Sequence, residues 1–231
     1  MPFPLMVFAA GFGTRMGALT ADRPKPLIPV AGKALIDHAL DLSSDAKVGP
    51  TVVNLHYLAG QLETHLQNRP IALSHGRTQI LEAGGGLRKA LPLLGSGPVM
   101  TLNSDAVWTG QNPLTQLAAH WDNTRMDALL LLLPAEKAKG HSGTGDFLLD
   151  DTGRLTRAAG AKGLIYLGAQ ILRPDGLHAI DKDVFSLNLL WDQMIANGRL
   201  YGLIHQGGWC DVGRPEGIAT AEALLQEAPD V

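Results

Sequence analysis

A glycine-rich segment near the start of the chain carries the first residues that indicate chemistry. Residues 7–16 read VFAAGFGTRM, an apolar run that leads directly into Gly11, Gly13 and Arg15. Glycines let consecutive backbone N–H groups turn toward one anion, and an arginine adds a fixed fork of donors. The loop is not a Walker A loop, because no Gly-Lys-Ser/Thr follows, and Met16 stands where a dinucleotide fingerprint requires a third glycine. We therefore predict a phosphate-binding loop of another kind.

A lysine between two prolines follows this loop. Lys25 lies between Pro24 and Pro26, and proline fixes its own φ while biasing the preceding residue away from helix. We expect an extended segment in which the ammonium group is aimed at developing negative charge with little ordering cost. Composition alone favours a solvated surface lysine. The glycine loop at this spacing favours the functional interpretation.

Two aspartates far apart in the chain are candidate ligands of a hard cation. Asp105 follows an apolar run at 99–103, and Asp211 lies in GGWCDVGRPE, just before the last predicted helix. Mg²⁺ prefers oxygen ligands and binds through one or two carboxylates together with substrate phosphates. The alternative role for each aspartate is a helix or turn cap. We interpret Cys210 as a small buried residue, and the eight histidines show no zinc-ligand spacing.

Composition excludes several classes of protein. The chain has 231 residues, 19 Lys and Arg against 22 Asp and Glu, and a formal net charge of −3, which gives no general reason to bind nucleic acid. No run approaches the ~18 apolar residues of a membrane span, and the apolar start has no basic leader. With a single cysteine, we expect a soluble cytoplasmic protein. Nothing in the composition specifies an oligomeric state.

Apolar runs alternate with segments of helical spacing, which predicts an α/β fold: a mixed, mostly parallel sheet flanked by helices. DTG at 151–153 predicts a hairpin, so the second half should be more antiparallel. The small-residue stretch 137–145 predicts a loop, either closing over a ligand or simply connecting elements. The predicted strands are 4–9, 51–54, 71–74, 99–103, 128–133, 147–150 and 164–171; the predicted helices are 35–42, 59–67, 86–91, 114–123, 184–197 and 216–226.

The motif AAGFGTRM, followed by PKPL at 24–27 and PVAGK at 29–33, resembles the sugar-phosphate nucleotidyltransferases. The resemblance implies the Rossmann-like nucleotide-diphospho-sugar transferase fold in one domain, with a nucleotide-binding lobe at 1–110 and a sugar-binding lobe at 111–231. It implies Mg²⁺ held by Asp105 and Asp211, and catalytic roles for Arg15 and Lys25. The implied nucleotide-binding residues are Ala10, Gly11, Gly13, Thr14, Arg15 and Lys25.

The first metal segment departs from the family pattern Asn-Gly-Asp-Val-Trp. Ser104 replaces the glycine, and Ala106 is inserted between the aspartate and the valine. Serine is well tolerated unless that position requires a positive φ. The departure therefore concerns the loop around the aspartate and leaves the metal prediction in place.

LEAGGG at 81–86 resembles the N-acetylmuramate 1-phosphate uridylyltransferases and their relatives, which implies contacts of Glu82, Gly84 and Gly85 with the base. Free N–H groups and small residues at a helix start suit a flat ligand, although a tight strand–helix turn would also use glycine. The second half should hold the sugar. The candidate sugar-binding residues are Asn103, Asp146, Tyr166 and Gly168.

The resemblance implies one reaction and leaves alternatives. A sugar 1-phosphate, preferably N-acetylmuramate 1-phosphate, attacks the α-phosphate of a nucleoside triphosphate, preferably UTP, and pyrophosphate leaves. This would serve cell-wall sugar recycling. A mannose-1-phosphate guanylyltransferase or a hexose-1-phosphate nucleotidyltransferase is the alternative within the class. A non-catalytic regulator that binds nucleotide sugars is the alternative outside it, although such a protein would not need both carboxylates.

Overall fold

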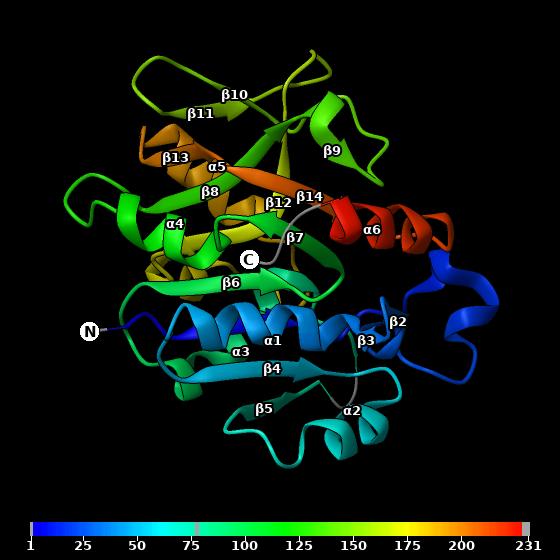
Figure 1. The fold of residues 1–231 in the computed structure, drawn as a ribbon. Coiled ribbons are helices and arrows are strands. Elements are labelled where there is room, and N and C mark those ends of the chain that lie inside the picture. Colours follow the sequence, from blue (N-terminus) through cyan, green and yellow to red (C-terminus); the bar gives the residue numbers. More distant parts are fainter. Residues whose placement is uncertain (1, 77–78, 228–231) are drawn as a thin grey trace.

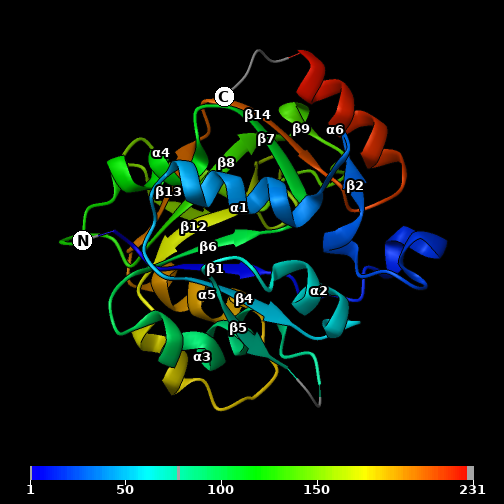
Figure 2. The same ribbon diagram turned by 60° about the horizontal axis from the view of Figure 1, so that its bottom comes forward.

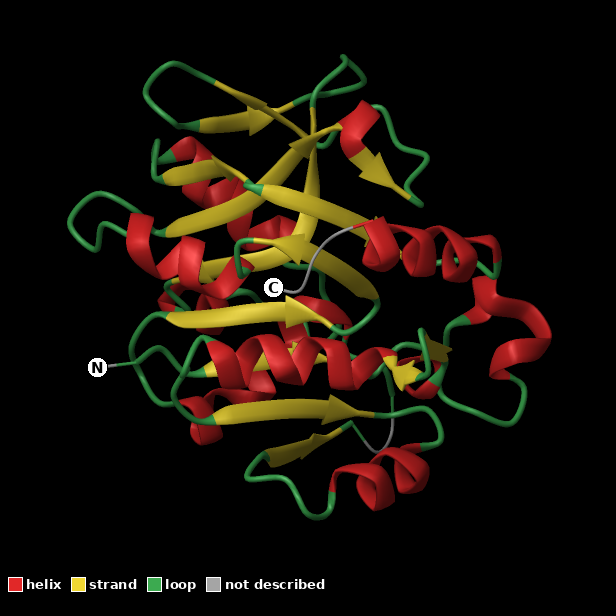
Figure 3. Ribbon diagram, viewed as in Figure 1, coloured by secondary structure: helices red, strands yellow, loops and turns green. Residues whose placement is uncertain are grey.

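The amino-terminal half forms the parallel part of a nine-stranded sheet (Figures 1 and 3). The computed structural model describes residues 2–76 and 79–227. The strands β6, β1, β4 and β5 lie side by side in this order, all parallel. Their bounds are Leu5–Phe8 for β1, Thr51–Leu55 for β4, Ala72–His75 for β5 and Val99–Asn103 for β6. All four predicted strands of this half are confirmed.

Helices cover both faces of the sheet, which explains why its central strands are apolar throughout. Apolar residues of α1, α2 and α4 share one buried cluster with Leu5 and Val7, whereas those of α3 and α5 share another with Met6 (Figure 2). The bounds are Leu35–Asp45 for α1, Ala59–Leu66 for α2, Glu82–Leu94 for α3, Pro113–His120 for α4, Asn188–Ala196 for α5 and Glu216–Glu227 for α6. The six predicted helices exist, with α3 beginning earlier and α5 later than expected.

The second half continues the same sheet with antiparallel pairing. β12 pairs with β6 on one side and β8 on the other, so strands of the two predicted lobes share one sheet. β10 and β11 form the predicted hairpin, and β13 runs parallel to β8. The bounds are Ala128–Pro134 for β8, Phe147–Leu149 for β10, Leu155–Arg157 for β11, Leu164–Leu172 for β12 and Leu200–Ile204 for β13.

A second, three-stranded sheet was not predicted from the sequence. It consists of β7 (Ala106–Gly110), β14 (Gly207–Asp211) and β9 (Ala138–Lys139), with β14 in the middle. β7 and β14 are antiparallel. Helix α6 packs on these two strands: Ala221 and Leu224 of the helix share a small apolar cluster with Val107 of β7 and Cys210 of β14. None of the helices in the described part of the chain has the length and apolar character required to span a bilayer.

The β7–β14 pair tolerates no side chain at one of its glycines. A Cβ atom on Gly207 would lie 1.9 Å from the carbonyl oxygen of Thr109. We predict that Gly207→Ala lowers the free energy of unfolding by about 2 kcal/mol, because the strands must separate to accept the methyl group. Urea unfolding measures the change. Gly97→Ala is the control, since a Cβ atom there meets nothing within 4 Å; equal stability of the two variants would contradict the prediction.

Candidate active site

The site lies where the parallel strands end. The arrowheads of β4 and β6 point to the same edge in Figure 1, and the dark-blue segment that follows β1 projects from this edge. Such an edge is where open α/β sheets bind ligands. A hollow of ≈ 250 Å³ opens there. It is lined by Phe8, Ala10, Gly11, Asn54, Ile80, Leu81, Glu82, Ala83, Asn103 and Asp105.

The two glycines of the loop have different tasks. Gly11 lines the hollow, and a Cβ atom there would meet nothing within 4 Å. Gly13 has a φ of 67°, and a Cβ atom there would lie 2.8 Å from Cβ of Lys25. Gly13 therefore lets the stem of the lysine approach the loop closely. Thr14 begins a 3₁₀ helix, η1 (Thr14–Thr20), in which Thr14 and Arg15 are exposed.

Lys25 is held by its own short helix. Pro24 is extended as predicted, but Lys25–Leu27 forms a 3₁₀ turn (η2), so the expectation that the whole segment is extended was wrong. Proline suits the second position of such a turn because its φ is already close to the helical value. The lysine is only 8% exposed, and its Nζ lies 2.7 Å from Oδ2 of Asp105. The turn thus directs the ammonium group onto the first predicted metal ligand.

The β7–β14 ladder brings the two aspartates together. Asp211 is paired with Ala106, the residue after Asp105, and the N–H of Val212 donates to the carbonyl oxygen of Asp105 at 2.9 Å. This bond extends the pairing of the two strands by one residue, to Asp105 before β7 and Val212 after β14. Lys25, Asp105 and Asp211, which the sequence analysis placed in one site, therefore converge.

Neighbouring charged side chains and burial shift the pKa of the Asp211 carboxyl group. Burial, and then the negative charge of Asp105, raise the pKa of the Asp211 carboxyl group, while Lys25 and Arg15 lower it. A Cβ atom on Gly213 would lie 2.6 Å from Oδ2 of Asp211 and 3.1 Å from a terminal nitrogen of Arg15. Arg15 therefore flanks the same carboxylate.

Two neighbouring carboxylates form a donor set that suits a divalent cation. Like charges at short range disfavour each other's ionisation, and a cation between them relieves this repulsion. Among the described residues no group of three or more His, Cys, Asp and Glu is positioned to hold a metal. A pair of carboxylates is a donor set that Mg²⁺ can use, since this ion takes one or two carboxylates and completes its shell with water and substrate oxygens. Cys210 is fully buried, and burial raises its pKa to about 11, which fits its predicted structural role.

The predicted base-binding residues behave differently from one another. Glu82 lines the hollow. The N–H groups of Gly84 and Gly85 instead donate to the carbonyl oxygen of Phe185, at 2.9 and 3.2 Å. A Cβ atom on Gly84 would lie 2.4 Å from the Phe185 ring, and one on Gly85 would lie 2.3 Å from the carbonyl oxygen of Asp183. The free N–H groups expected at these glycines are therefore already bonded, and close chain packing explains the glycines.

The predicted sugar-binding residues form two pairs. Gly168, at a φ of 85°, packs against Asn103, and a Cβ atom there would lie 2.7 Å from the Asn103 amide nitrogen. Asn103 lines the hollow. The carboxylate of Asp146 accepts a 2.9 Å hydrogen bond from the N–H of Tyr166, whose ring packs edge-on against Trp191. Burial raises the pKa of the Tyr166 hydroxyl group. Of the four predicted residues the structure therefore brings only Asn103 to the hollow; Gly168 packs behind it, and Asp146 and Tyr166 do not line the hollow.

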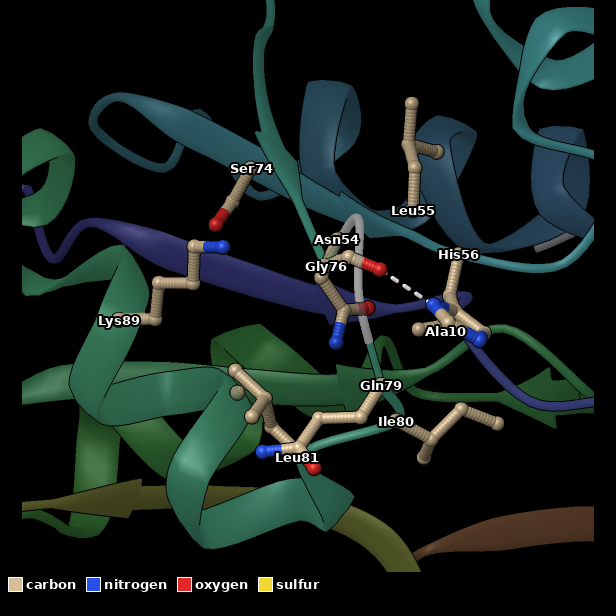
Figure 4. A pocket seen from close by; sticks show the side chains of 11 residues that line it. Ala10, Asn54, Leu55, His56, Ser74, Gly76, Gln79, Ile80, Leu81 and Lys89 are labelled. Carbon is tan, nitrogen blue, oxygen red and sulfur yellow. Dashed lines mark hydrogen bonds between the residues drawn. The ribbon is translucent and has the colours of Figure 1, made fainter. Parts of the chain in front are cut away.

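Asn54, which the sequence offered only as a weak candidate for sugar binding, is hydrogen-bonded to the residue that leads into the loop. It is 9% exposed at the end of β4, and its Oδ1 accepts a hydrogen bond from the N–H of Ala9 at 2.7 Å. It lines both the hollow and a narrow adjoining pocket of ≈ 20 Å³ (Figure 4). In that pocket Lys89 and His56 bond to the backbone carbonyls of His75 and Gly76. A buried amide at the end of an apolar strand was the available sequence signal.

Residues 5–166 match the family model described as the MobA-like NTP transferase domain. The N-acetylmuramate alpha-1-phosphate uridylyltransferase of Caulobacter vibrioides is 43% identical over 96% of this chain and 97% of its own length. The protein of the same name from Neisseria meningitidis is 33% identical over 95% and 96%.

Solved structures share the fold at lower identity. HddC from Yersinia pseudotuberculosis, complexed with GMP-PN, superposes with a TM-score of 0.77 at 18% identity over 96% of this chain and 98% of its own. A putative glucose-1-phosphate thymidylyltransferase from Bacillus anthracis has a TM-score of 0.79 at 13% identity over 99% and 97%. These likenesses confirm the predicted α/β fold.

The open space around Gly11 generates a prediction about ligand binding. We expect Gly11→Ala to keep or slightly raise the thermal midpoint, because no atom opposes the methyl group and alanine restricts the unfolded chain. The methyl group lies beside the hollow, where the loop's N–H groups would meet phosphate, so nucleoside triphosphate affinity should fall about tenfold. Calorimetric titration measures it, with Gly97→Ala as control. Unchanged affinity in Gly11→Ala would show that phosphate does not approach this glycine.

Proposed function

The chain belongs to the MobA-like NTP transferase family, and from this we propose that it is a nucleotidyltransferase that condenses UTP with N-acetylmuramate 1-phosphate. The products are UDP-N-acetylmuramate and pyrophosphate. The observation that carries the proposal is the convergence of Lys25, Asp105 and Asp211 beside the glycine loop. The choice of base and sugar rests on the two relatives that share one name and match over nearly their whole length.

The reaction needs positive charge more than acid–base chemistry. An oxygen of the sugar phosphate forms a bond to the α-phosphorus, and the bond from that phosphorus to the bridging oxygen of pyrophosphate breaks. The attacking oxygen is already anionic, so a general base adds little, and the barrier lies in bringing anions together in line. Lys25 and Arg15 are the cations that we assign to this task. In related types of site, removing one preorganised donor costs ~10²–10³ in rate.

We assign Asp105 and Asp211 as the ligands of Mg²⁺. When bound, this ion supplies positive charge to the phosphates and orients them. The pKa of the Asp211 carboxyl group is raised by burial and by Asp105 even though Lys25 and Arg15 lie nearby, and a cation bound by both carboxylates would offset this repulsion, which supports the assignment. A regulator that only binds nucleotide sugars would have no use for this pair.

The sugar phosphate is assigned to the side of the hollow at the end of β6. Asn103 offers an amide there, and Gly168 on β12 packs closely against Asn103 and supports its position. Asp146 and Tyr166 are held to each other away from the residues that line the hollow and would contact only the outer part of the sugar. We place the reaction in the cytoplasm, in the reuse of cell-wall sugars, since N-acetylmuramate is a component of the bacterial wall.

A pyrophosphate-release screen tests the proposal. Four nucleoside triphosphates are paired with N-acetylmuramate, mannose, glucose and N-acetylglucosamine 1-phosphates, in the presence of Mg²⁺. We expect kcat/KM for UTP with N-acetylmuramate 1-phosphate to exceed every other pair by about 10²-fold or more, because unpaired polar groups penalise the wrong substrates. Preference for GTP with mannose 1-phosphate would replace the proposed substrates. If substrates bind but no pair releases pyrophosphate, the proposal that the protein is a nucleotidyltransferase is contradicted.

A further inference from the structure

The phosphate-binding loop is short and mostly exposed. Its residues 14–20 form the 3₁₀ helix η1, which is interrupted at Gly17 by a φ of 58°. At the ends of this helix the N–H of Met16 donates to the carbonyl oxygen of Gly13 and that of Ala21 to the carbonyl oxygen of Ala18, and the Thr20 hydroxyl group donates to the carbonyl oxygens of Gly13 and Gly17. A short, kinked and exposed helix opens at low cost in free energy. Contacts from other parts of the chain therefore help to keep the loop ordered.

The segment 56–61, between β4 and the first turns of α2, supplies contacts to the carboxyl end of the loop. The hydroxyl group of Tyr57 lies 2.9 Å from the carbonyl oxygen of Thr20 and 3.2 Å from that of Ala21. The side-chain amide of Gln61 donates to the carbonyl oxygen of Asp22 at 2.7 Å. Three backbone carbonyls in a row are thus contacted by two side chains of one segment.

The same segment contacts the amino end of the loop. The ring of Phe12, which stands between Gly11 and Gly13, lies 5.6 Å from the rings of both His56 and Tyr57, in edge-on arrangements. Phe12 is 48% exposed, and these two rings pack against it. Tyr57 is the residue that touches both ends of the loop, through its ring and through its hydroxyl group.

The residue after Tyr57 has an unusual backbone conformation. Leu58 has a φ of 48°, a left-handed conformation that is unfavourable for a leucine. It lies between β4 and α2 and turns the chain sharply after Tyr57. Unfavourable conformations of this kind persist only where the surroundings hold them. Here the contacts of Tyr57 and Gln61 with the loop belong to those surroundings.

We propose that Tyr57 is a positioning residue for the triphosphate. Its hydroxyl group holds the carboxyl end of the phosphate-binding loop, so that Thr14 and Arg15 are in place before the nucleotide arrives. This proposal rests on the nucleotidyltransferase function proposed above. Preorganisation of this kind acts on nucleotide affinity, because a loop that is already ordered loses less entropy on binding.

Tyr57→Phe isolates the hydroxyl group and keeps the ring against Phe12. We expect the dissociation constant of UTP with Mg²⁺, measured by calorimetry, to rise about fivefold, the loss expected for one neutral hydrogen bond. Amides of residues 11–22 should exchange with deuterium faster. At saturating UTP, kcat/KM for the sugar 1-phosphate should stay within about twofold. A residue of merely structural importance would lower the thermal midpoint and change all these quantities together.

Tyr201→Phe is the matched control. Tyr201 lies on β13, far from the loop in the sheet, and its hydroxyl group accepts a hydrogen bond from Arg154. It should leave UTP affinity and loop exchange unchanged. Unchanged exchange in Tyr57→Phe would overturn the loop-holding role, and equal effects of the two variants would do the same. Exchange needs no substrate, so it separates this result from failure of the proposed function, which would appear as absence of UTP turnover by the unmodified protein.

Discussion

The pairing of β7 with β14 is the constraint on which the site depends. β7 begins directly after Asp105, and β14 ends at Asp211, so two carboxylates from distant parts of the chain lie at one end of one ladder. Several close contacts leave this ladder little freedom. A Cβ atom on Gly140, next to β9, would lie 2.1 Å from the carbonyl oxygen of Asp211, and α6 packs on both strands. The geometry of the carboxylates therefore follows from the fold.

Because Asp105 and Asp211 lie close together, their negative charges must be offset by neighbouring cationic groups. Two nearby carboxylates repel each other, and burial makes the repulsion stronger because less water screens it. Lys25 offsets part of the charge, held at Asp105 by a 3₁₀ turn and by the absence of a side chain on Gly13. Arg15, which follows the glycines of the loop, also lies near Asp211. The site thus holds two carboxylates and two cationic side chains, and it suits a cation together with an anionic ligand.

Local patterns in the sequence predicted much of this, and contacts between distant segments account for the rest. The apolar strands, the loop around Gly11 and Gly13, and the assignment of Lys25, Asp105 and Asp211 to one site were predicted, because each depends on residues close in sequence or on a family motif. The ion pair between Lys25 and Asp105 was not predicted. β7 and β14 were not predicted, since each is a short strand with glycines and a tryptophan whose stability comes from distant segments: from each other, from β9 and from α6. Gly84 and Gly85 show a second limit. A glycine needed for close chain packing has the same appearance in sequence as one needed for a ligand.

The most direct measurement of the central claim is anomalous diffraction from crystals grown with Mn²⁺ and UTP. Mn²⁺ takes the oxygen ligands of Mg²⁺ and gives an anomalous signal that identifies its position. The account predicts an anomalous peak within bonding distance of carboxylate oxygens of both Asp105 and Asp211, in contact with phosphate oxygens. Bound UTP whose metal lies away from both aspartates would contradict it.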